Sequence, residues 1–290
     1  MDRLLFVFLL TAFINLINTL TRSSRLSGVR TGSLATAISL FGVVYLAASF
    51  ANTLQAPLLA STVELIIKNA YNQALGIAAA ADAAGTQVYQ QALTGLNHKL
   101  RFVIAGASLG TLAGMLVIPS FVTSFANAIS AFGRTGSVFK VVPLILVSLF
   151  KPGSGILKLR MSSLATLRKI VTTRMTTPKS FLLWNLGSYS LWTCNVLAGL
   201  YAGALYPEFR GTAVMMAAIV GNAAIVVNVM MVDPVLAKVT DAVARGEEKE
   251  LELKQIIFYL AVSNLLGTLL AQAIFEPVAR GLMLLTRWIS

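Results

Sequence analysis

The sequence has very few of the residues that soluble enzymes use for chemistry. It contains one cysteine, Cys194, and one histidine, His98. A single cysteine excludes an intramolecular disulfide, and these two residues cannot build a multi-histidine or thiolate-rich metal site. The phosphate-loop patterns GxxxxGK[ST] and GxGxxG are absent, as are the zinc motif HExxH and the redox motif CxxC. We therefore expect no metal, no cofactor and no ATP-driven pump, and we do not expect an enzyme.

Charged residues are also scarce. They make up 12% of the chain, against about 25% in an ordinary soluble domain. Hydrophobic residues make up 57% and the mean hydropathy is +0.78, more apolar surface than a soluble fold of 290 residues could bury. The net charge of +12 lies between apolar runs, where it orients helices and attracts anionic lipid rather than nucleic acid. The composition therefore predicts an integral membrane protein.

Six apolar stretches are long enough to cross a hydrocarbon core of about 30 Å as helices. They cover residues 4–20, 34–51, 102–119, 181–205, 212–232 and 256–275. The sequence thus predicts an all-α, polytopic transmembrane helical bundle of six spans, forming one domain over residues 1–290. Two more stretches are ambiguous. One, from Leu58 to Ala84, is alanine-rich but carries polar residues, and the other, from Val141 to Phe150, is apolar but short. If both insert, the bundle has eight spans.

Loop charge predicts the orientation, because lysine and arginine next to a span stay preferentially in the cytoplasm. Three arginines separate the first two spans, and residues 133–180 carry nine basic residues and no acidic one. We interpret 133–180 as a basic cytoplasmic region. Residues 233–255 mix both signs and are predicted to form a charged cytoplasmic helical segment. With six spans, both termini and the turn from Tyr206 to Arg210 lie outside.

Ten amide side chains lie within or at the ends of the apolar runs. Taken singly, each is best explained by hydrogen bonding between helices. Taken together, they suggest a polar groove through the bundle. The ten residues are Asn15, Asn18, Asn52, Gln55, Asn185, Asn195, Asn222, Asn228, Asn264 and Gln272.

Three carboxylates near span ends are candidates for coupling or gating, since a transporter driven by ions needs a group that can bind a proton or cation. These three are Glu64, Asp233 and Glu276. Structural alternatives stand beside these roles. Glu276 can pair with Arg280 one turn later, and Asp233, which precedes a proline, can cap a helix. In the outer turn, Glu208 is expected to pair with Arg210.

Four arginines share one predicted membrane face, namely Arg22, Arg25, Arg30 and Arg134. Two interpretations remain open. The arginines either enforce topology only, or they bind an anionic headgroup such as a pyrophosphate, which suits the bidentate guanidinium fork. Glycines beside Arg30 and Arg134 leave backbone N–H groups approachable, as an anion site requires.

Several ordered blocks of the sequence are familiar. The opening resembles that of the Amj family of bacterial lipid II flippases, in RLSGVRTGSLATAISLF and then FANTLQAPLLAS. Later family blocks are similar to ASLGTLAGMLVIPSFVTSFANAI, LYAGALYPEFRGTA, VDPVLAKVTDAV and NLLGTLLAQAIFEP, in the same order. The resemblance touches most of the chain and weakens over residues 68–98 and 152–179.

The resemblance implies a flippase that moves lipid II, a polyprenyl pyrophosphate with a disaccharide-pentapeptide, from the inner to the outer leaflet of the bacterial cytoplasmic membrane without consuming ATP. Lipid II and membrane lipids would be its partners, in peptidoglycan synthesis. On this basis we expect Arg25, Arg30 and Arg134 to contact the pyrophosphate. We expect the groove to be lined by Asn15, Asn18, Asn52 and Gln55. Because the chain is small for such a headgroup, a homodimer could supply a shared cavity.

Three alternatives come from other functional classes. An ion-coupled secondary transporter of a small anionic solute would also use arginines and a carboxylate. A membrane enzyme acting on polyprenyl phosphates would need clustered acids or histidines, which the chain lacks. A non-transporting scaffold of a cell-wall machine would tolerate neutral residues in place of Arg30 and Arg134.

Overall fold

The structure is a computed structural model that describes residues 3–76, 84–136 and 164–290. The described residues form helices and contain no strand. The helices are α1 (Arg3–Thr21), α2 (Ser24–Thr31), α3 (Leu34–Leu75), α4 (Gln87–Thr135), α6 (Leu164–Thr172), α7 (Ser180–Leu205), η2 (Pro207–Phe209), α8 (Arg210–Val227), the π-helical turn η3 (Asn228–Val232), α9 (Asp233–Ala244) and α10 (Glu250–Ile289).

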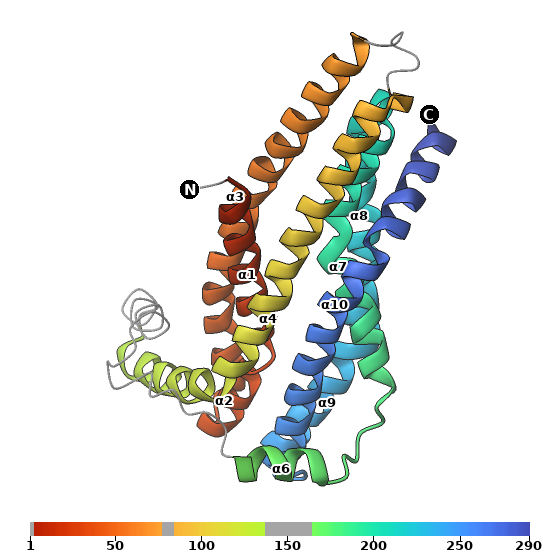
Figure 1. Cartoon of the computed structure of the whole chain (residues 1–290). Helices are drawn as coiled ribbons and strands as arrows, with labels where there is room; N and C mark the ends of the chain where they lie inside the picture. The colour runs from red at the N-terminus through yellow and green to blue at the C-terminus, as the bar shows by residue number, and fades with distance from the viewer. Residues whose placement is uncertain (1–2, 77–83, 137–163) are drawn as a thin grey trace.

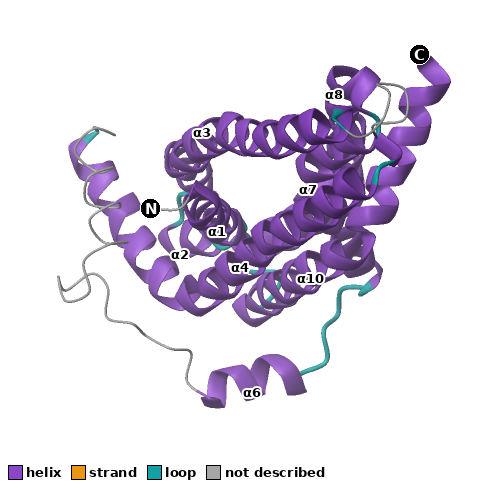
Figure 2. Ribbon diagram, turned by 45° about the horizontal axis from the view of Figure 1, so that its top comes forward, coloured by secondary structure: helices purple, strands orange, loops and turns teal. Residues whose placement is uncertain are grey.

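The long helices run side by side between two ends of the molecule (Figure 1). We call the end with α2, α6, α9 and the start of α10 the inner end, and the end with η2 and the C-terminus the outer end. Helices α1, α3 and α4 pack together as one half, and α7, the α8–η3–α9 rod and α10 form the other. Figure 2 shows α4 and α10 next to each other where the halves meet. The all-α bundle predicted from the sequence is therefore confirmed.

Five helical segments are both long enough and apolar enough to cross a membrane. They are Arg3–Thr31, Leu34–Leu75, Gln87–Thr135, Pro207–Ala244 and Glu250–Ile289. Helix α7 has 26 residues, about 39 Å at 1.5 Å per residue, so its length also suffices. It contains Asn185, Ser188, Ser190 and Asn195 and is not among the segments that are apolar enough by composition. Of the six predicted spans, five are both long enough and apolar enough to cross a membrane, and α7 is long enough only.

The ambiguous stretch from Leu58 to Ala84 does not form a span of its own. Residues up to Leu75 continue α3, which passes through Pro57 without ending. The buried side chains of this part recur at helical spacing, at Leu59, Val63, Ile67, Ala70 and Ala74, and pack against α4. One continuous apolar face therefore extends the helix, and this segment does not return across the bundle as eight spans require. The stretch from Val141 to Phe150 lies outside the described residues.

The charged segment 233–255 contains the whole of α9 and the first residues of α10, joined by a short turn. Helix α9 ends at Ala244 and α10 begins at Glu250. Between them Gly246 adopts a positive φ of 77°, a conformation that glycine takes without steric cost. The chain reverses here, so the charged segment is a helical hairpin at the inner end.

Helix α6 lies across the inner end, roughly perpendicular to the long helices (Figure 1). Two side chains of α10 hold it and the following residues. Gln255 donates to the carbonyls of Ile170 and Thr173, both at 2.8 Å. Glu252 accepts from the backbone N–H groups of Thr176 and Thr177 at 3.1 and 3.0 Å. This part of the predicted basic region is therefore fixed to the start of α10.

Glycines allow α1 and α4 to approach closely. Gly106, Gly110 and Gly114 are spaced four residues apart on α4, so they face α1 in one row. An added Cβ at Gly110 would collide with the carbonyl oxygen of Ala12. Small residues at this spacing are a common way to pack membrane helices, because the backbones then make van der Waals contact.

We expect replacement of Gly110 by valine to destabilise the bundle. The new side chain must push α1 away, and such overpacking typically costs about 1–3 kcal/mol. Gly95→Val on the same helix is the matched control, because nothing lies within 4 Å of a Cβ there. Thermal unfolding of the detergent-solubilised proteins should show a lower midpoint for Gly110→Val only. Equal midpoints for the two variants would refute this account of the α1–α4 contact.

Candidate functional site

A polar network lies where the two halves of the bundle meet toward the inner end. At its centre is Arg22, between the end of α1 and the start of α2. The hydroxyl of Ser23 donates to the carbonyl of Leu20 at 2.6 Å, and that of Ser24 donates to Thr21 at 2.7 Å. These side chains bond to the backbone at the end of α1, as serines often do where a helix is interrupted. The interruption places Arg22 at the junction of the two helices.

Three amide oxygens from three helical segments accept hydrogen bonds from Arg22. Its Nη1 donates to Oδ1 of Asn185 on α7 at 2.8 Å and to Oδ1 of Asn264 on α10 at 3.4 Å. Its Nη2 donates to Oδ1 of Asn228, in the π-helical turn, at 2.7 Å. Among the described residues, no carboxylate forms a hydrogen bond or ion pair with Arg22. Asp233, the first residue of α9, attracts Arg22 electrostatically over a longer distance, and Arg25 repels it.

Further hydrogen bonds orient the three amides. Nδ2 of Asn185 donates to Oδ1 of Asn264 at 2.8 Å and to the hydroxyl of Ser263 at 3.0 Å. Nδ2 of Asn228 donates to the hydroxyl of Ser188, also at 3.0 Å. Each amide nitrogen of these two asparagines therefore points away from Arg22, and the oxygens face its guanidinium. The network is organised around a cation.

The π-helical turn contributes directly to this network. A π turn inserts an extra residue into a helix and is often found at functional sites. Asn228 begins the turn, and Asp233 follows it at the start of α9. Asp233 makes no capping hydrogen bond, because the helical rod continues through the turn and leaves no free end. The helix-cap interpretation of Asp233 is therefore wrong.

The predicted groove residues have different environments. Asn15 is buried and accepts from the Tyr189 hydroxyl at 3.1 Å, which links α1 to α7. Nε2 of Gln55 donates to the hydroxyl of Thr11 at 2.8 Å. Asn18 has a buried Nδ2 that lacks a hydrogen-bond partner in the described part of the chain, and so does Oε1 of Gln55. Asn52 is exposed.

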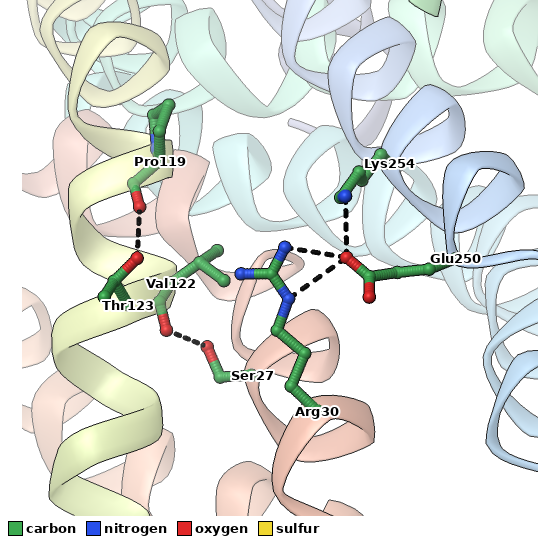
Figure 3. A network of polar contacts seen from close by, with 7 residues as sticks. All are labelled: Ser27, Arg30, Pro119, Val122, Thr123, Glu250 and Lys254. Carbon is green, nitrogen blue, oxygen red and sulfur yellow. Dashed lines mark hydrogen bonds and ion pairs between the residues drawn. The ribbon is translucent and has the colours of Figure 1, made fainter. Parts of the chain in front are cut away.

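The three arginines expected to contact a pyrophosphate all lie at the inner end, in separate settings. Arg30 binds Oε1 of Glu250 through Nη2 at 2.7 Å and Nε at 3.1 Å, and Lys254 binds the same oxygen at 2.7 Å (Figure 3). Arg134 is exposed at the end of α4, where its Nε lies 3.4 Å from the carbonyl of Ser130. Arg25 is half-buried and pairs with no other residue that the structure describes.

Figure 3 also shows how α2 is anchored beside this ion pair. The hydroxyl of Ser27 donates to the carbonyl of Val122 on α4 at 3.0 Å. On the residue next to Val122, the hydroxyl of Thr123 donates to the carbonyl of Pro119, one turn earlier on α4, at 3.2 Å. Helix α2 is thus fixed to α4 on one side and to α10 on the other.

The two remaining carboxylate candidates are ion-paired. Glu276 lies 2.6 Å from Nη2 of Arg280, so the pairing one turn later is confirmed. It also lies 3.7 Å from Nη2 of Arg101 on α4. At the outer end, Oε1 of Glu64 lies 3.7 Å from Nη2 of Arg210. Arg210 therefore pairs with Glu64 on α3 and not with Glu208, as the sequence had suggested.

Arg101 makes several contacts across the junction of the halves. Its Nε donates to Oδ1 of Asn97 at 2.6 Å, its Nη1 donates to the carbonyl of Gln272, and its guanidinium lies 5.7 Å from the ring centroid of Phe275. The amide of Gln272 donates back to the carbonyl of Arg101 at 2.9 Å. This set of contacts fixes α4 against α10 toward the outer end.

Sequence reasoning named Arg22 and its three asparagines but did not bring them together. A signal was present. Asn185 lies near the start of one apolar run, Asn228 near the end of the next and Asn264 in the first half of the last. Since adjacent runs alternate in direction, all three lie toward the same membrane face, which is also the face of Arg22.

A scan against protein-family models matches residues 10–286 to the family described as Amj, alternate to MurJ. The chain belongs to the Amj family. A relative from Bacillus subtilis (strain 168), named lipid II flippase Amj, is 32% identical over 289 residues, covering 99% of this chain and 97% of the relative. No solved structure matches the chain. The family resemblance noted in the sequence is thus confirmed, and the matched range contains Arg22, Asn185, Asn228 and Asn264.

We expect Glu276→Gln to lower stability, because Arg101 and Arg280 would lose their shared counter-ion. Both side chains of the Arg101–Glu276 pair are 32% exposed, so solvent screening limits the loss to about 1 kcal/mol. Glu248→Gln, in the exposed connection before α10, is the control. Thermal unfolding in detergent should show a lower midpoint for Glu276→Gln alone. An unchanged midpoint would mean that the pair contributes nothing to holding α4 against α10.

Proposed function

We propose that this protein is a lipid II flippase of the bacterial cytoplasmic membrane. It moves the undecaprenyl-pyrophosphate-linked precursor of peptidoglycan from the inner to the outer leaflet and consumes no ATP. Support comes from the relative named lipid II flippase Amj, which the chain matches over nearly its whole length. It also comes from the apolar helical bundle, which has the length and composition to lie in a bilayer.

The Arg22 network is the structural observation that carries this proposal. A bundle with a purely structural role needs few polar groups, whereas this one holds an arginine and three amides between its halves. The headgroup of lipid II combines a charged pyrophosphate with sugars and a peptide, which offer many donors and acceptors. Cationic and amide side chains along one path are complementary to that chemistry.

Arg25, Arg30 and Arg134 are proposed to meet the pyrophosphate first, at the inner surface. Arg25 and Arg134 have no carboxylate partner in the described residues, so an anion can approach them directly. Arg30 is bound to Glu250, and a pyrophosphate would compete with that carboxylate. Asn15, Asn18, Asn52 and Gln55 are proposed to line the path. The buried amide nitrogen of Asn18 supports this role, because it has a hydrogen bond still to make.

Among the carboxylates proposed for coupling or gating, Asp233 is favoured. Glu64 and Glu276 already have arginine partners. Asp233 has no hydrogen-bonded partner among the described residues, yet it is close enough to influence Arg22. We also propose a homodimer, in which a second copy covers exposed apolar residues of α8 such as Met215 and Ile219.

The proposed activity is tested by complementation. In bacteria depleted of their other lipid II flippases, expression of this protein should restore growth and the appearance of lipid II at the outer surface. An inactive but well-expressed variant is the control for expression itself. Lack of rescue by well-expressed wild-type protein would exclude the flippase assignment, and uptake of a small anion by vesicles containing it would favour a solute transporter.

The same assay tests the individual roles. Arg30→Lys and Arg134→Lys keep the charge but lose the bidentate fork, so flipping should fall while topology is unchanged. Asp233→Asn should abolish any dependence of flipping on the proton gradient. Full activity in both lysine variants would leave these arginines as topology determinants, and a normal gradient response in Asp233→Asn would exclude that residue from coupling.

The orientation can be tested with introduced cysteines. We expect Glu208→Cys, in the outer turn, to react with a membrane-impermeant maleimide in intact cells. Glu248→Cys, in the inner connection, should react only after the cells are permeabilised. The native Cys194 is buried in α7, so background labelling should be low. The reverse pattern would show that the inner end faces outward.

A further inference from the structure

Three arginines of the first half contact α10 at three levels. Arg30 binds Glu250, Arg22 binds Asn264 and Arg101 pairs with Glu276. These positions on α10 are separated by 14 and 12 residues, or about 21 Å and 18 Å along the helix. Arg22 therefore lies between the other two contacts, well inside the bundle.

Only the middle arginine lacks a carboxylate partner among the residues described. Arg30 and Arg101 each reach an acidic side chain, while the residue at the middle level of α10 is an amide. The neutral oxygens of Asn185, Asn228 and Asn264 solvate the guanidinium but leave its charge in place. Arg22 thus has no directly bonded counter-ion and only Asp233 at longer range; a charge held in this way inside an apolar bundle is costly, and such residues are commonly functional.

We infer that Arg22 is an internal binding site for the pyrophosphate of a polyprenyl-linked substrate, distinct from the arginines at the inner surface. This inference rests on the proposed flippase function and assigns its substrate contact. The hydrogen bonds of Arg22 to amide oxygens have one charged partner, the guanidinium, whereas a phosphate oxygen also carries the opposite charge and so adds an ion pair to the hydrogen bond. It can therefore replace an amide oxygen on Arg22, and the released amide can bond to the remaining headgroup.

The arrangement of the amides supports exchange at this site. Asn228, the first residue of the π-helical turn, accepts a hydrogen bond from Arg22 at 2.7 Å and donates one to Ser188 at 3.0 Å. Asn264 contacts Arg22 at 3.4 Å, a long bond, while it accepts a shorter one of 2.8 Å from Asn185. The bond from Arg22 to Asn264 is thus the weakest of the three, and Asn264 keeps a partner when an anion displaces it.

The decisive variant is Asn264→Asp, which gives Arg22 the carboxylate partner that the other two levels have. An ion pair at this position should preserve or raise the thermal stability of the protein, but it should block access of an anion to the guanidinium. If Arg22 only fastens the helices, the added carboxylate leaves transport intact. Asn97→Asp is the matched control, since it adds one carboxylate beside Arg101 and leaves Arg22 untouched.

Binding is measured as the rise in unfolding midpoint of the detergent-solubilised protein with undecaprenyl pyrophosphate, inorganic pyrophosphate or undecaprenol. We expect stabilisation of wild type and Asn97→Asp by undecaprenyl pyrophosphate and not by undecaprenol. For Asn264→Asp and Arg22→Gln, the concentration that gives half the shift should rise at least about tenfold, which corresponds to 1.4 kcal/mol of binding free energy. Stabilisation by inorganic pyrophosphate as well would mean that the site binds the pyrophosphate group without the polyprenyl chain. That result would also support the inference.

The outcomes separate the inference from the proposed function. Normal binding and normal rescue by Asn264→Asp would overturn the inference while leaving the flippase assignment in place. Failure of the wild type to be stabilised by either pyrophosphate would also overturn it. Failure of the wild type to rescue depleted cells would instead count against the flippase function. If Arg22→Gln does not fold, Asn264→Asp alone decides the matter.

Discussion

The hydrogen bonds of Arg22 constrain the whole inner part of the bundle. A guanidinium among apolar helices must be solvated by the protein, and here three helical segments supply the oxygens. Each segment must therefore present an asparagine at one depth and one rotation. The serines that orient the asparagine nitrogens, Ser188 and Ser263, are fixed by the same requirement. The register of α7, α10 and the α8–η3–α9 rod follows from satisfying one cation.

The close glycine contacts lie within the halves, whereas the arginine contacts with α10 lie between them. Within the halves, glycines bring backbones together, as Gly110 does with Ala12 and Gly199 with Ala217 on α8. Such contacts depend on the close fit of two helices, and neither water nor an anion can take the place of either helix. Between the halves, Arg22, Arg30 and Arg101 make polar contacts with α10. A polar contact can be replaced by water or by an anion, so the junction of the halves is where ligand chemistry can compete with the protein's own.

Hydropathy and charge predicted the class of fold, because both follow from transfer of side chains between water and lipid. The helices α1, α7 and α10 include the expected spans, and Glu276 pairs with Arg280 as local helical spacing requires. Sequence alone did not show that residues beyond Pro57 continue α3. Proline usually ends a helix in water, but the apolar face from Leu59 to Ala74 packs on α4 and outweighs the lost hydrogen bond.

The site was harder to predict because it is built from long-range contacts. Arg22 and Asn264 are 242 residues apart, and nothing local marks them as partners. Arg210 likewise forms its ion pair with Glu64 on α3 and not with the neighbouring Glu208. Sequence reasoning favoured Arg30 and Arg134 because glycines flank them, yet Arg30 is already bound by Glu250. Proximity in sequence is a good guide along one helix and a poor one between helices.

The three arginine levels along α10 also differ in how strongly each can attract an anion. At the Arg30 level and at the Arg101 level, one carboxylate is shared by two cations. Lys254 joins Arg30 on Glu250, and Arg280 joins Arg101 on Glu276. These side chains are about one-third exposed or more, so water and salt screen the excess positive charge there. Arg22 lies among buried side chains such as Asn185 and Asn264, where screening is weaker and the same charge acts more strongly. The attraction for a pyrophosphate is therefore expected to be greatest at Arg22, whose hydrogen-bond partners are amides and whose nearest carboxylate influence, from Asp233, acts over a longer distance.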